Sequence, residues 1–155
     1  MTILLAIVAL VLHRAVPVYG ECPNGFIRHD DMCYHFSHDT ETWIDALVTC
    51  DKLFGAQLVE IETAKENNYL VNESSVLKAE FWIGGNDIQV EGEWKWATSG
   101  DDVTFTAWGG PPSNSHGNEN CIEINTLVWN DDQCGKQQRY ICEKPLNNEQ
   151  IVGRK

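Results

Sequence analysis

The chain has 155 residues and a formal net charge of −12 at neutral pH, from 23 acidic and 11 basic residues. This length suggests a single domain, and the acidic balance excludes nucleic acid as a partner, because nucleic-acid-binding proteins neutralise phosphates with Lys and Arg. An acidic surface suits a divalent cation, which takes hard oxygen ligands, although surface carboxylates also simply keep an exported protein soluble.

Residues 1–20 have the features of a signal peptide. Ile3–Leu12 is an unbroken apolar run of about ten residues, where a membrane span needs roughly twenty, and Val18-Tyr19-Gly20 offers small residues at the positions that a signal peptidase recognises. The segment before the run lacks Lys and Arg, so an uncleaved anchor is the alternative. We expect a secreted, extracellular protein with no membrane span.

Six cysteines follow this segment, and an even number in a small exported domain predicts three disulfides, with fifteen pairings open. Zinc is the competing explanation, but no two of the cysteines form a C-x2-C or C-x4-C pair, which favours disulfides. Residues 22–34 are turn-rich and bounded by two of the cysteines, which predicts a small hairpin. The six are Cys22, Cys33, Cys50, Cys121, Cys134 and Cys142.

The first predicted helix begins after Thr42 and ends at Gly55. Asp45 lies three residues after Thr42, close to a capping-box arrangement, and glycine commonly follows the end of a helix. Five residues between these limits recur at helical spacing, so they share one face that we expect to be buried. They are Trp43, Ala46, Leu47, Cys50 and Leu53.

A second helix is predicted over residues 64–71, with Thr63 as its cap and Glu66 three residues later reaching back to it. The tripeptide Asn72-Glu73-Ser74 follows directly. It is a glycosylation sequon, a short motif that often occurs by chance but that an exported chain can use. Asn72 is therefore the expected glycosylation site.

Beyond residue 80 the helical period disappears and short strand patterns replace it. Helices in the first half and strands in the second indicate an α+β domain over residues 21–145, with a polar, frayed tail over 146–155. Residues 100–120 are rich in Gly, Pro, Ser and Asn, and such a long loop is either disordered or held by something other than a hydrophobic core. The predicted strands are 58–61, 81–84, 93–96, 121–124 and 140–142.

Oxygen-bearing side chains gather around this loop in the sequence. Calcium takes six to eight oxygen ligands from carboxylates, amides and carbonyls, it relieves the repulsion between neighbouring carboxylates, and its coordination supplies energy that orders a loop. The same residue types are ordinary in loops, so the pattern alone is a weak indication of a metal site. The residues are Asp87, Glu91, Asn114, Glu119, Asn130 and Asp131.

Residues 22–144 resemble a complete C-type lectin domain of the long form, of the secreted, single-domain, perlucin-like kind. The matching residues occur in order along nearly the whole mature chain. They are the Cys22/Cys33 hairpin, Trp43 with Ala46 and Cys50, Trp82-Ile83-Gly84-Gly85, Trp94-Lys95-Trp96, Cys121, Trp129-Asn130-Asp131, Cys134 and Cys142. The resemblance implies two helices with antiparallel strands, a long calcium-binding loop, and the disulfides Cys22–Cys33, Cys50–Cys142 and Cys121–Cys134.

The resemblance also implies how the domain binds its ligand. In the family, the principal calcium site uses a loop tripeptide centred on a cis-proline, a later Glu and an Asn-Asp pair, and two neighbouring sugar hydroxyls complete the calcium shell. Glu119, Asn130 and Asp131 match these ligands, and Pro112 matches the proline, where a cis bond costs little. We therefore expect calcium-dependent binding of glycans, with Ca²⁺ as cofactor; the alternative for Asn130 and Asp131 is a structural role in capping a turn.

The tripeptide itself departs from the family pattern. Mannose-type members have Glu-Pro-Asn and galactose-type members have Gln-Pro-Asp, whereas this chain has Pro111-Pro112-Ser113. Proline offers no side-chain oxygen, and the serine hydroxyl is a short, neutral ligand. Ser113 is the expected sugar contact from this loop, and Asn114, backbone oxygen or water would complete the calcium shell. The sugar class is not assigned by this sequence.

An auxiliary calcium site occurs in some members of the family. Its positions correspond to Asp87, Glu91, Asn114 and Glu119, and the alternative for Asp87 and Glu91 is that they only solvate a turn. His116 could hydrogen-bond a sugar hydroxyl, although a lone loop histidine is more often simply solvated.

Four further expectations concern function, packing and assembly. No nucleophile-elbow, zincin or phosphate-loop motif is present, so the chain is not expected to be an enzyme. The rival function is the same fold binding protein or mineral surfaces without calcium-dependent sugar recognition, which the Pro111 and Ser113 departure favours. Trp108 is expected to pack in the core rather than on a sugar. A homo-oligomer would have to form through the domain surface or the termini, because no coiled-coil heptads are visible.

Overall fold

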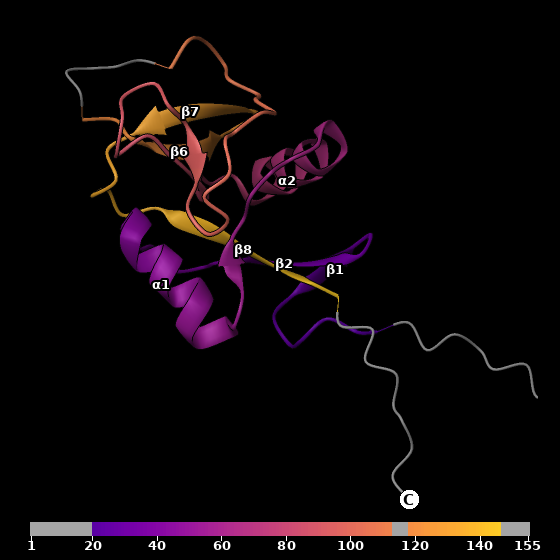
Figure 1. Cartoon of the computed structure of the whole chain (residues 1–155). Coiled ribbons are helices and arrows are strands. Elements are labelled where there is room, and N and C mark those ends of the chain that lie inside the picture. The colour runs from indigo at the N-terminus through magenta and orange to yellow at the C-terminus, as the bar shows by residue number, and fades with distance from the viewer. Residues whose placement is uncertain (1–19, 113–117, 147–155) are drawn as a thin grey trace, which may run out of the picture.

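Two helices and eight strands make up the part of the chain that the computed structural model describes, residues 20–112 and 118–146. The helices lie between the strands of the first half, and strands alone follow them (Figure 1). The elements are β1 (Ile27–His29), β2 (Met32–Phe36), α1 (Trp43–Phe54), β3 (Gln57–Leu58), α2 (Ala64–Leu77), β4 (Phe81–Asn86), β5 (Lys95–Trp96), β6 (Cys121–Asn125), β7 (Val128–Asp132) and β8 (Arg139–Pro145).

The strands form one mixed sheet in the order β1-β2-β8-β4-β6-β7, with β3 paired to β8 and β5 paired to β4. All pairs are antiparallel except β4 with β8, where Phe81 lies opposite Arg139. The last strand of the chain therefore lies in the middle of the sheet, between an early hairpin and the strands that carry the long loop. This arrangement confirms the predicted α+β class.

The α1 helix begins and ends where the sequence predicts. The Thr42 hydroxyl accepts a hydrogen bond from the Asp45 backbone N–H at 3.2 Å, and Gly55 closes the helix in the left-handed region at φ 54°, which glycine adopts without steric cost. The prediction for Leu53 was wrong, because its side chain is 75 % exposed. Leu53 lies about 80° around the axis from Trp43, at the edge of the buried face.

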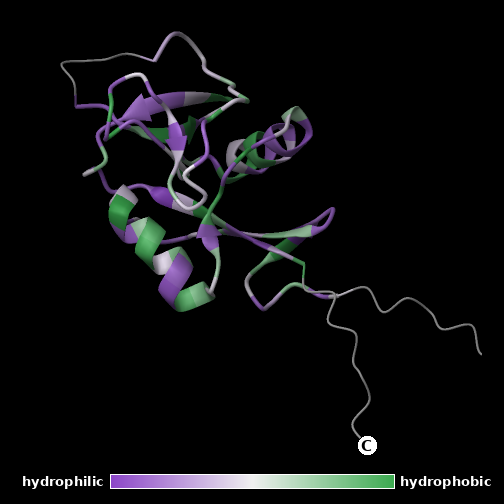
Figure 2. Ribbon diagram, in the orientation of Figure 1, coloured by the Kyte–Doolittle hydropathy of each residue, from purple (hydrophilic) through white to green (hydrophobic). Residues whose placement is uncertain are grey.

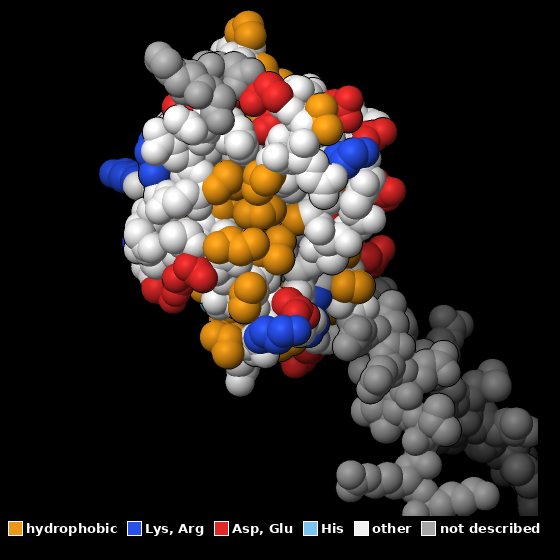
Figure 3. Space-filling view, turned by 60° about the vertical axis from the view of Figure 1, so that its left-hand side comes forward, with side chains coloured by type: hydrophobic (Ala, Val, Ile, Leu, Met, Phe, Trp, Pro, Cys, Tyr) orange, Lys and Arg blue, Asp and Glu red, His pale blue; other side chains and the backbone are white. Residues whose placement is uncertain are grey.

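Other apolar side chains of α1 also lie outside the core. Ile44 and Val48 are both about half exposed. Figure 3, which turns the α1 side of Figure 1 forward, shows hydrophobic side chains gathered on that face. Figure 2 shows the same helix with apolar and polar residues alternating along it.

The α2 helix is longer than predicted, running to residue 77 instead of 71. Its Thr63 cap is confirmed, since the hydroxyl accepts the Glu66 N–H at 3.2 Å. The added turns, residues 72–77, carry mostly polar side chains, and Ser74 is their only buried residue. Its hydroxyl donates to the Leu70 carbonyl at 2.8 Å. The sequon residue Asn72 lies on the exposed side of this helix.

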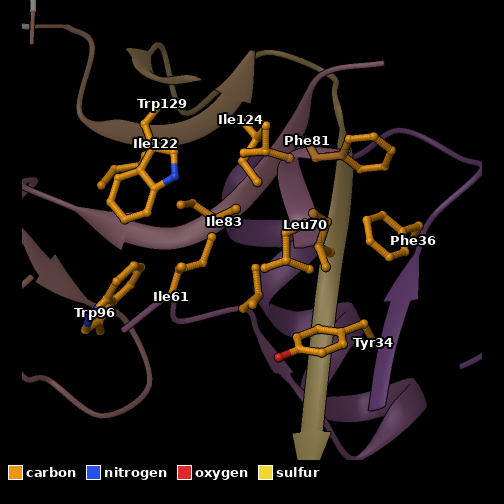
Figure 4. Close-up of a cluster of buried hydrophobic side chains, with 13 residues drawn as sticks. Tyr34, Phe36, Ile61, Leu70, Phe81, Ile83, Trp96, Ile122, Ile124 and Trp129 are labelled. Atoms are coloured by element: carbon orange, nitrogen blue, oxygen red, sulfur yellow. The ribbon is translucent and has the colours of Figure 1, made fainter. Parts of the chain in front are cut away.

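Two hydrophobic clusters cover opposite faces of the central strands. Phe81 and Ile83 of β4 belong to the cluster under α2, shown in Figure 4, whereas Trp82 between them belongs to the cluster under α1. Tyr140 and Ile141 of β8 divide in the same way, as the alternation of side chains along a strand requires. The fold therefore has two core layers that share one sheet.

Three disulfides close the fold, and all three implied pairings are confirmed. Cys22–Cys33 closes the N-terminal hairpin. Cys50–Cys142 joins α1 to the central strand β8, and Cys121–Cys134 joins β6 to the segment after β7.

Two predicted strands are shorter in the structure. In place of the predicted strand 58–61 the structure has only the two residues of β3, Gln57–Leu58. In place of the predicted strand 93–96 it has only the two residues of β5, Lys95–Trp96. Val59 still donates its N–H to the Ile141 carbonyl at 2.9 Å, but the next N–H, of Glu60, donates to the Glu143 carboxylate at 2.8 Å instead of to a backbone carbonyl. A side chain thus replaces the regular ladder at this point.

Both chain ends lie beside the β1–β2 hairpin in the described range. Leu146 is buried and donates its N–H to the Asp31 carbonyl at 2.8 Å. The predicted signal peptide, apart from Gly20, and residues 147–155 of the predicted tail lie outside the described residues. Within the described ranges, neither helix has the length and apolar character needed to cross a bilayer.

Candidate functional site

The β6–β7 hairpin carries the Trp129-Asn130-Asp131 motif. Its two strands are in register, with Asn130 opposite Glu123 and Asp131 opposite Ile122. Successive side chains alternate between the two faces of a strand, so Asn130 shares a face with Glu123. Trp129 is fully buried and Asp131 is 3 % exposed, whereas Asn130 is half-buried. The hairpin therefore holds the motif rigidly while leaving the Asn130 side chain at the surface.

Trp129 anchors this hairpin to the rest of the domain. Its indole N–H donates to the Asn67 side-chain oxygen of α2 at 2.8 Å, in a buried position. Its backbone N–H donates to the Ala107 carbonyl at 2.9 Å, and its carbonyl accepts the Gly109 N–H at 3.0 Å. The long loop is thereby paired to β7 over a short parallel stretch.

The described part of the long loop is held by hydrophobic packing as well as by these hydrogen bonds. Trp108 lies edge-on to Trp129 with ring centroids 5.8 Å apart, and its ring centroid lies 5.0 Å from that of Trp94. It packs against the core as predicted, but it is only partly buried and also lines the cavity beside the hairpin. Phe105 makes a second edge contact with Trp129 at 5.7 Å. The prediction that this loop is either disordered or held by something other than a hydrophobic core was therefore wrong for residues 103–109. Their aromatic residues are too widely spaced in the sequence to form a recognisable pattern.

Gly109 brings the loop backbone close to β7. A Cβ atom at this position would lie 2.5 Å from Cγ2 of Val128, well inside the contact distance of real side chains. Glycine is therefore required for this approach. The contact places the following residues of the loop over the end of the hairpin.

A cavity of about 340 Å³ opens where the loop meets the hairpin. Asn130 and Asp131 line it together with Pro111 of the tripeptide. The structure thus brings three predicted positions to one place. The cavity is lined by Trp108, Gly109, Gly110, Pro111, Asn125, Val128, Trp129, Asn130 and Asp131.

The remaining residues predicted from this loop are placed as follows. Ser113, Asn114 and His116 lie outside the described residues. The expected cis bond before Pro112 is not found: no peptide bond in the described ranges is cis. The trans form is favoured by about 0.5–1 kcal/mol at X–Pro bonds, and Pro111 has no side-chain oxygen with which a ligand could hold the other form.

The Asn130 amide is fixed by two hydrogen bonds. Its Nδ2 donates to Oε1 of Glu123 at 3.0 Å and to the Asp131 carbonyl at 2.8 Å. The same carboxylate oxygen accepts Nδ2 of Asn125 at 3.2 Å. Burial raises the pKa of Glu123 above its ordinary value, and hydrogen bonds from Asn130, Gln138 and Asn125 act in the opposite direction.

Asp87 and Asn120, the neighbour of Glu119 in the sequence, meet at the base of the long loop. The loop leaves β4 and returns to β6 at neighbouring positions, with Asn86 opposite Cys121, and the Asp87 N–H donates to the Asn120 carbonyl at 3.1 Å. Oδ2 of Asp87 accepts the Gly92 N–H at 2.8 Å, which is the turn role considered for it. Its other oxygen, Oδ1, is buried and has no hydrogen-bond partner.

The donor atoms at this end of the molecule are oxygens. The carboxylates of Asp87, Glu119 and Asp131 and the amide oxygen of Asn130 suit a hard cation such as calcium, and the orphaned Oδ1 of Asp87 is an acceptor of the required kind. Glu91 is exposed on the turn after β4. Among residues 20–112 and 118–146, no three His, Cys, Asp or Glu side chains are grouped closely enough to hold a metal.

Two residues of this region escaped the sequence analysis. Glu123 sits in a strand that reads as apolar, and Asn67 lies on the buried face of a helix. Both are polar residues at positions where the local pattern requires a hydrophobic one, and that mismatch is the signal that could have identified them.

The comparisons with known proteins place the chain in a family. Residues 39–144 match the model of the lectin C-type domain. The chain is 33 % identical over 127 residues to C-type lectin domain family 4 member M of Nomascus concolor, covering 80 % of this chain and 31 % of that protein. It is 34 % identical over 128 residues to a perlucin-like protein of Mytilus galloprovincialis, covering 78 % and 81 %. It therefore spans about a third of the first of these relatives and most of the second.

Solved structures agree with this placement. The mouse scavenger receptor C-type lectin carbohydrate-recognition domain superposes with a TM-score of 0.75 at 33 % identity, covering 82 % of this chain and all of that one. A calcium-independent type II antifreeze protein superposes with a TM-score of 0.73 at 26 % identity, covering 83 % of this chain and 97 % of that one. The family is one of binding domains, in agreement with the expectation that the chain is not an enzyme. The chain belongs to the C-type lectin domain family.

Proposed function

We propose that this domain binds glycans through a calcium ion held at the end of β7. The observation that carries the proposal is the cavity lined jointly by Asn130 and Asp131, at the point where the long loop is pinned to the hairpin. Both side chains offer oxygen to a cation and to a hydroxyl. Their rigid placement on a strand suits recognition that depends on geometry.

Glu119, Asn130 and Asp131 would hold the principal ion, with Ser113 and Asn114 supplying further oxygens from the loop. Asp87, Glu91, Asn114 and Glu119 would hold a second ion, in keeping with the unpaired Oδ1 of Asp87. Calcium, when bound, would present open coordination positions to two sugar hydroxyls. The protein side chains would accept hydrogen bonds from the same hydroxyls.

In this proposal the loop tripeptide, and not the β6–β7 hairpin, would decide which class of sugar is bound. Mannose-type members of the family have a Glu at the position of Pro111, and galactose-type members have a Gln. Proline lacks the side-chain hydrogen-bonding group by which those members separate mannose from galactose. Val128 adds a partly exposed apolar wall to the cavity. Both sugar types must therefore be tested.

The setting of the protein is part of the same proposal. Residues 1–20 would direct secretion and be removed, which leaves the lectin domain of residues 21–145 and the tail. Asn72, exposed on α2, would carry a glycan. Single sugar contacts are weak, so useful avidity would require several copies, and these would assemble through the domain surface or the termini.

The test is retention of the secreted, oxidised protein on mannose and galactose resins in calcium, followed by elution with a chelator. We expect retention on at least one resin and its loss on chelation. Asp131→Ala should abolish retention and weaken calcium binding measured by calorimetry, with an unchanged circular dichroism spectrum. Asp51→Ala, which removes an exposed carboxylate paired with Lys52 on α1, is the matched control and should be retained. Retention of Asp131→Ala at the wild-type level would rule out this site.

A second function is favoured by one specific feature, the absence of a side-chain oxygen at Pro111. A domain of this fold could then bind a protein or mineral surface without calcium, and the similarity to a calcium-independent antifreeze protein is in keeping with that. Indifference of the protein to sugar resins and to chelator alike would support this second function over the first.

A further inference from the structure

We propose that Glu123 is a positioning residue: its buried carboxylate fixes the amide of Asn130 so that the amide oxygen, not the nitrogen, faces the cavity. This inference rests on the proposed function for its biological meaning, but the orientation itself is a property of the metal-free protein. The sequence places Glu123 inside an apolar strand, where a polar residue is out of pattern, but it does not show which residue Glu123 contacts.

The geometry comes from the pairing of β6 with β7. Glu123 and Asn130 are directly opposite across the two antiparallel strands, so their side chains lie side by side on one face. Nδ2 of Asn130 donates to Oε1 of Glu123 at 3.0 Å and to the Asp131 carbonyl at 2.8 Å. The amide nitrogen has two hydrogens, and both are used.

The chemistry then decides which amide atom turns outward. An ionised carboxylate only accepts hydrogen bonds, so the atom of Asn130 that faces Glu123 must be the nitrogen. The oxygen Oδ1 is left for the cavity that Asn130 lines. Calcium binds amide oxygen and is repelled by the N–H₂ group, so a reversed amide would remove one ligand from the proposed shell.

The position of Glu123 supports a role of this kind. It is 1 % exposed, between Ile122 and Ile124, and its second oxygen, Oε2, has no hydrogen-bond partner. A buried carboxylate that is incompletely satisfied costs stability, and an apolar residue at this position would avoid that cost. Asn125 also donates to Oε1 at 3.2 Å, which holds the acceptor in place beside Asn130.

The experiment exchanges the donor and the acceptor. Glu123→Met removes the acceptor while keeping an unbranched side chain of similar length, and we expect calcium binding measured by calorimetry to weaken 10- to 100-fold, the usual effect of losing a partner that orients a metal ligand. Asn130→Asp sets two carboxylates against each other and should also weaken binding. In the double variant Glu123→Gln/Asn130→Asp, the new amide can donate to the new carboxylate, and calcium affinity should recover substantially relative to Asn130→Asp alone.

Asn68→Asp is the matched control. It makes the same change of an amide to a carboxylate, but on an exposed residue of α2 that does not line the cavity. We expect its calcium affinity to stay close to that of the wild type. Wild-type calcium affinity in Glu123→Met, or no recovery in the exchanged pair, would overturn the proposal.

A measurement without calcium separates this inference from the function it rests on. In chelator, NMR should show slowed exchange of the Asn130 side-chain amide protons with solvent in the wild type, and faster exchange in Glu123→Met. Slowed exchange in a protein that takes up no calcium would refute the proposed function and leave the positioning role intact. Equal exchange in the two proteins would refute the positioning role even if calcium binds.

Discussion

The buried carboxylates of Glu60 and Glu143 accept hydrogen bonds from specific N–H donors, whereas the buried carboxylate of Asp132 pairs with Lys136. Oε1 of Glu60 accepts the backbone N–H groups of Thr98 and Ser99, at 2.8 and 3.1 Å. Oε1 of Glu143 accepts the Glu60 N–H at 2.8 Å and the Gln57 amide at 3.0 Å. Glu60 thus links its own segment to the turn after β5, and Glu143 continues the contact between β3 and β8 beyond the point where their ladder ends.

Glu143 makes stability depend on pH. Burial raises its pKa to about 8, with Glu66 and Glu60 adding repulsion and the Gln57 and backbone hydrogen bonds opposing it. A carboxyl group with a folded-state pKa above its unfolded value of 4.5 stabilises the fold fully below pH 4.5, and that contribution is lost as pH rises to about 8. We expect the free energy of unfolding, measured by urea titration in chelator, to fall over this range by up to about 5 kcal/mol.

Glu143→Gln should remove most of this dependence, because the amide oxygen can still accept from Glu60 and Gln57 but does not ionise. The variant should therefore be more stable than the wild type at pH 8. Glu62→Gln is the control, because Glu62 is exposed and lies two residues after Glu60. Its stability should depend on pH as that of the wild type does. If Glu143→Gln and the wild type lose stability equally between pH 5 and 8, burial of Glu143 is not the cause of the pH dependence.

At this scale, the sequence predicts the residues whose role is carried by a contiguous motif. Asn130 and Asp131 were predicted in this way and line one cavity; their binding of calcium and sugar stays a prediction. Glu123 was not predicted, because its role depends on the cross-strand register that puts it opposite Asn130, and a single sequence does not show register. The roles assigned to Ser113 and Asn114 stay predictions, since these residues lie outside the described ranges.

Among elements, the contact between α2 and β7 connects the core to the proposed site. Asn67 is buried on α2 and accepts the Trp129 indole N–H at 2.8 Å. Asn67→Leu would leave that N–H buried without an acceptor, at a cost of about 1–3 kcal/mol. We expect a corresponding loss in the free energy of unfolding, together with weaker calcium binding, because movement of Trp129 would displace the adjacent Asn130.

Asn68→Leu is the control for this prediction, since Asn68 is the exposed neighbour on the same helix. It should leave both stability and calcium affinity nearly unchanged. Equal stability of Asn67→Leu and the wild type would mean that the indole N–H finds another acceptor, and the connection from α2 to the site would then be absent.

Local signals explain why some element boundaries could be predicted and others could not. Thr42, Thr63 and Gly55 mark helix ends through interactions with their own neighbours, so the sequence predicts them. The C-terminal end of α2 lies at Lys78 in the left-handed conformation, which lysine does not signal. The ends of β3 and β5 depend on where distant side chains interrupt the ladder, as Glu143 does beside Glu60.

Across the whole molecule, the topology brings a long excursion of the chain back to its starting point. The segment between Asn86 and Cys121 leaves β4 and returns beside it, and its aromatic residues pack on Trp129. Hydrophobic packing therefore holds residues 103–109 of this segment against the core.

The disulfides also act on the stability of the whole molecule. The disulfide that closes the longer loop should contribute more to the free energy of unfolding. Cys50–Cys142 closes a sequence separation of 92 residues, whereas Cys22–Cys33 closes one of 11. Loop-closure entropy in the unfolded chain gives about 4.6 kcal/mol for the first and about 2.8 kcal/mol for the second. The first bond also joins α1 to the central strand β8, so its loss removes a contact between two core elements, whereas the second lies within one hairpin.

We therefore expect the Cys50→Ala/Cys142→Ala variant to unfold at a clearly lower urea concentration than Cys22→Ala/Cys33→Ala, with both compared against the oxidised wild type. Cys22→Ala/Cys33→Ala should keep its calcium affinity, because the hairpin that it loosens contacts neither β6 nor β7 in the sheet order. Equal losses from the two pairs would indicate that the unfolded chain is already compact around residues 50 and 142. In that case the long disulfide would stabilise this domain mainly through native packing between α1 and β8.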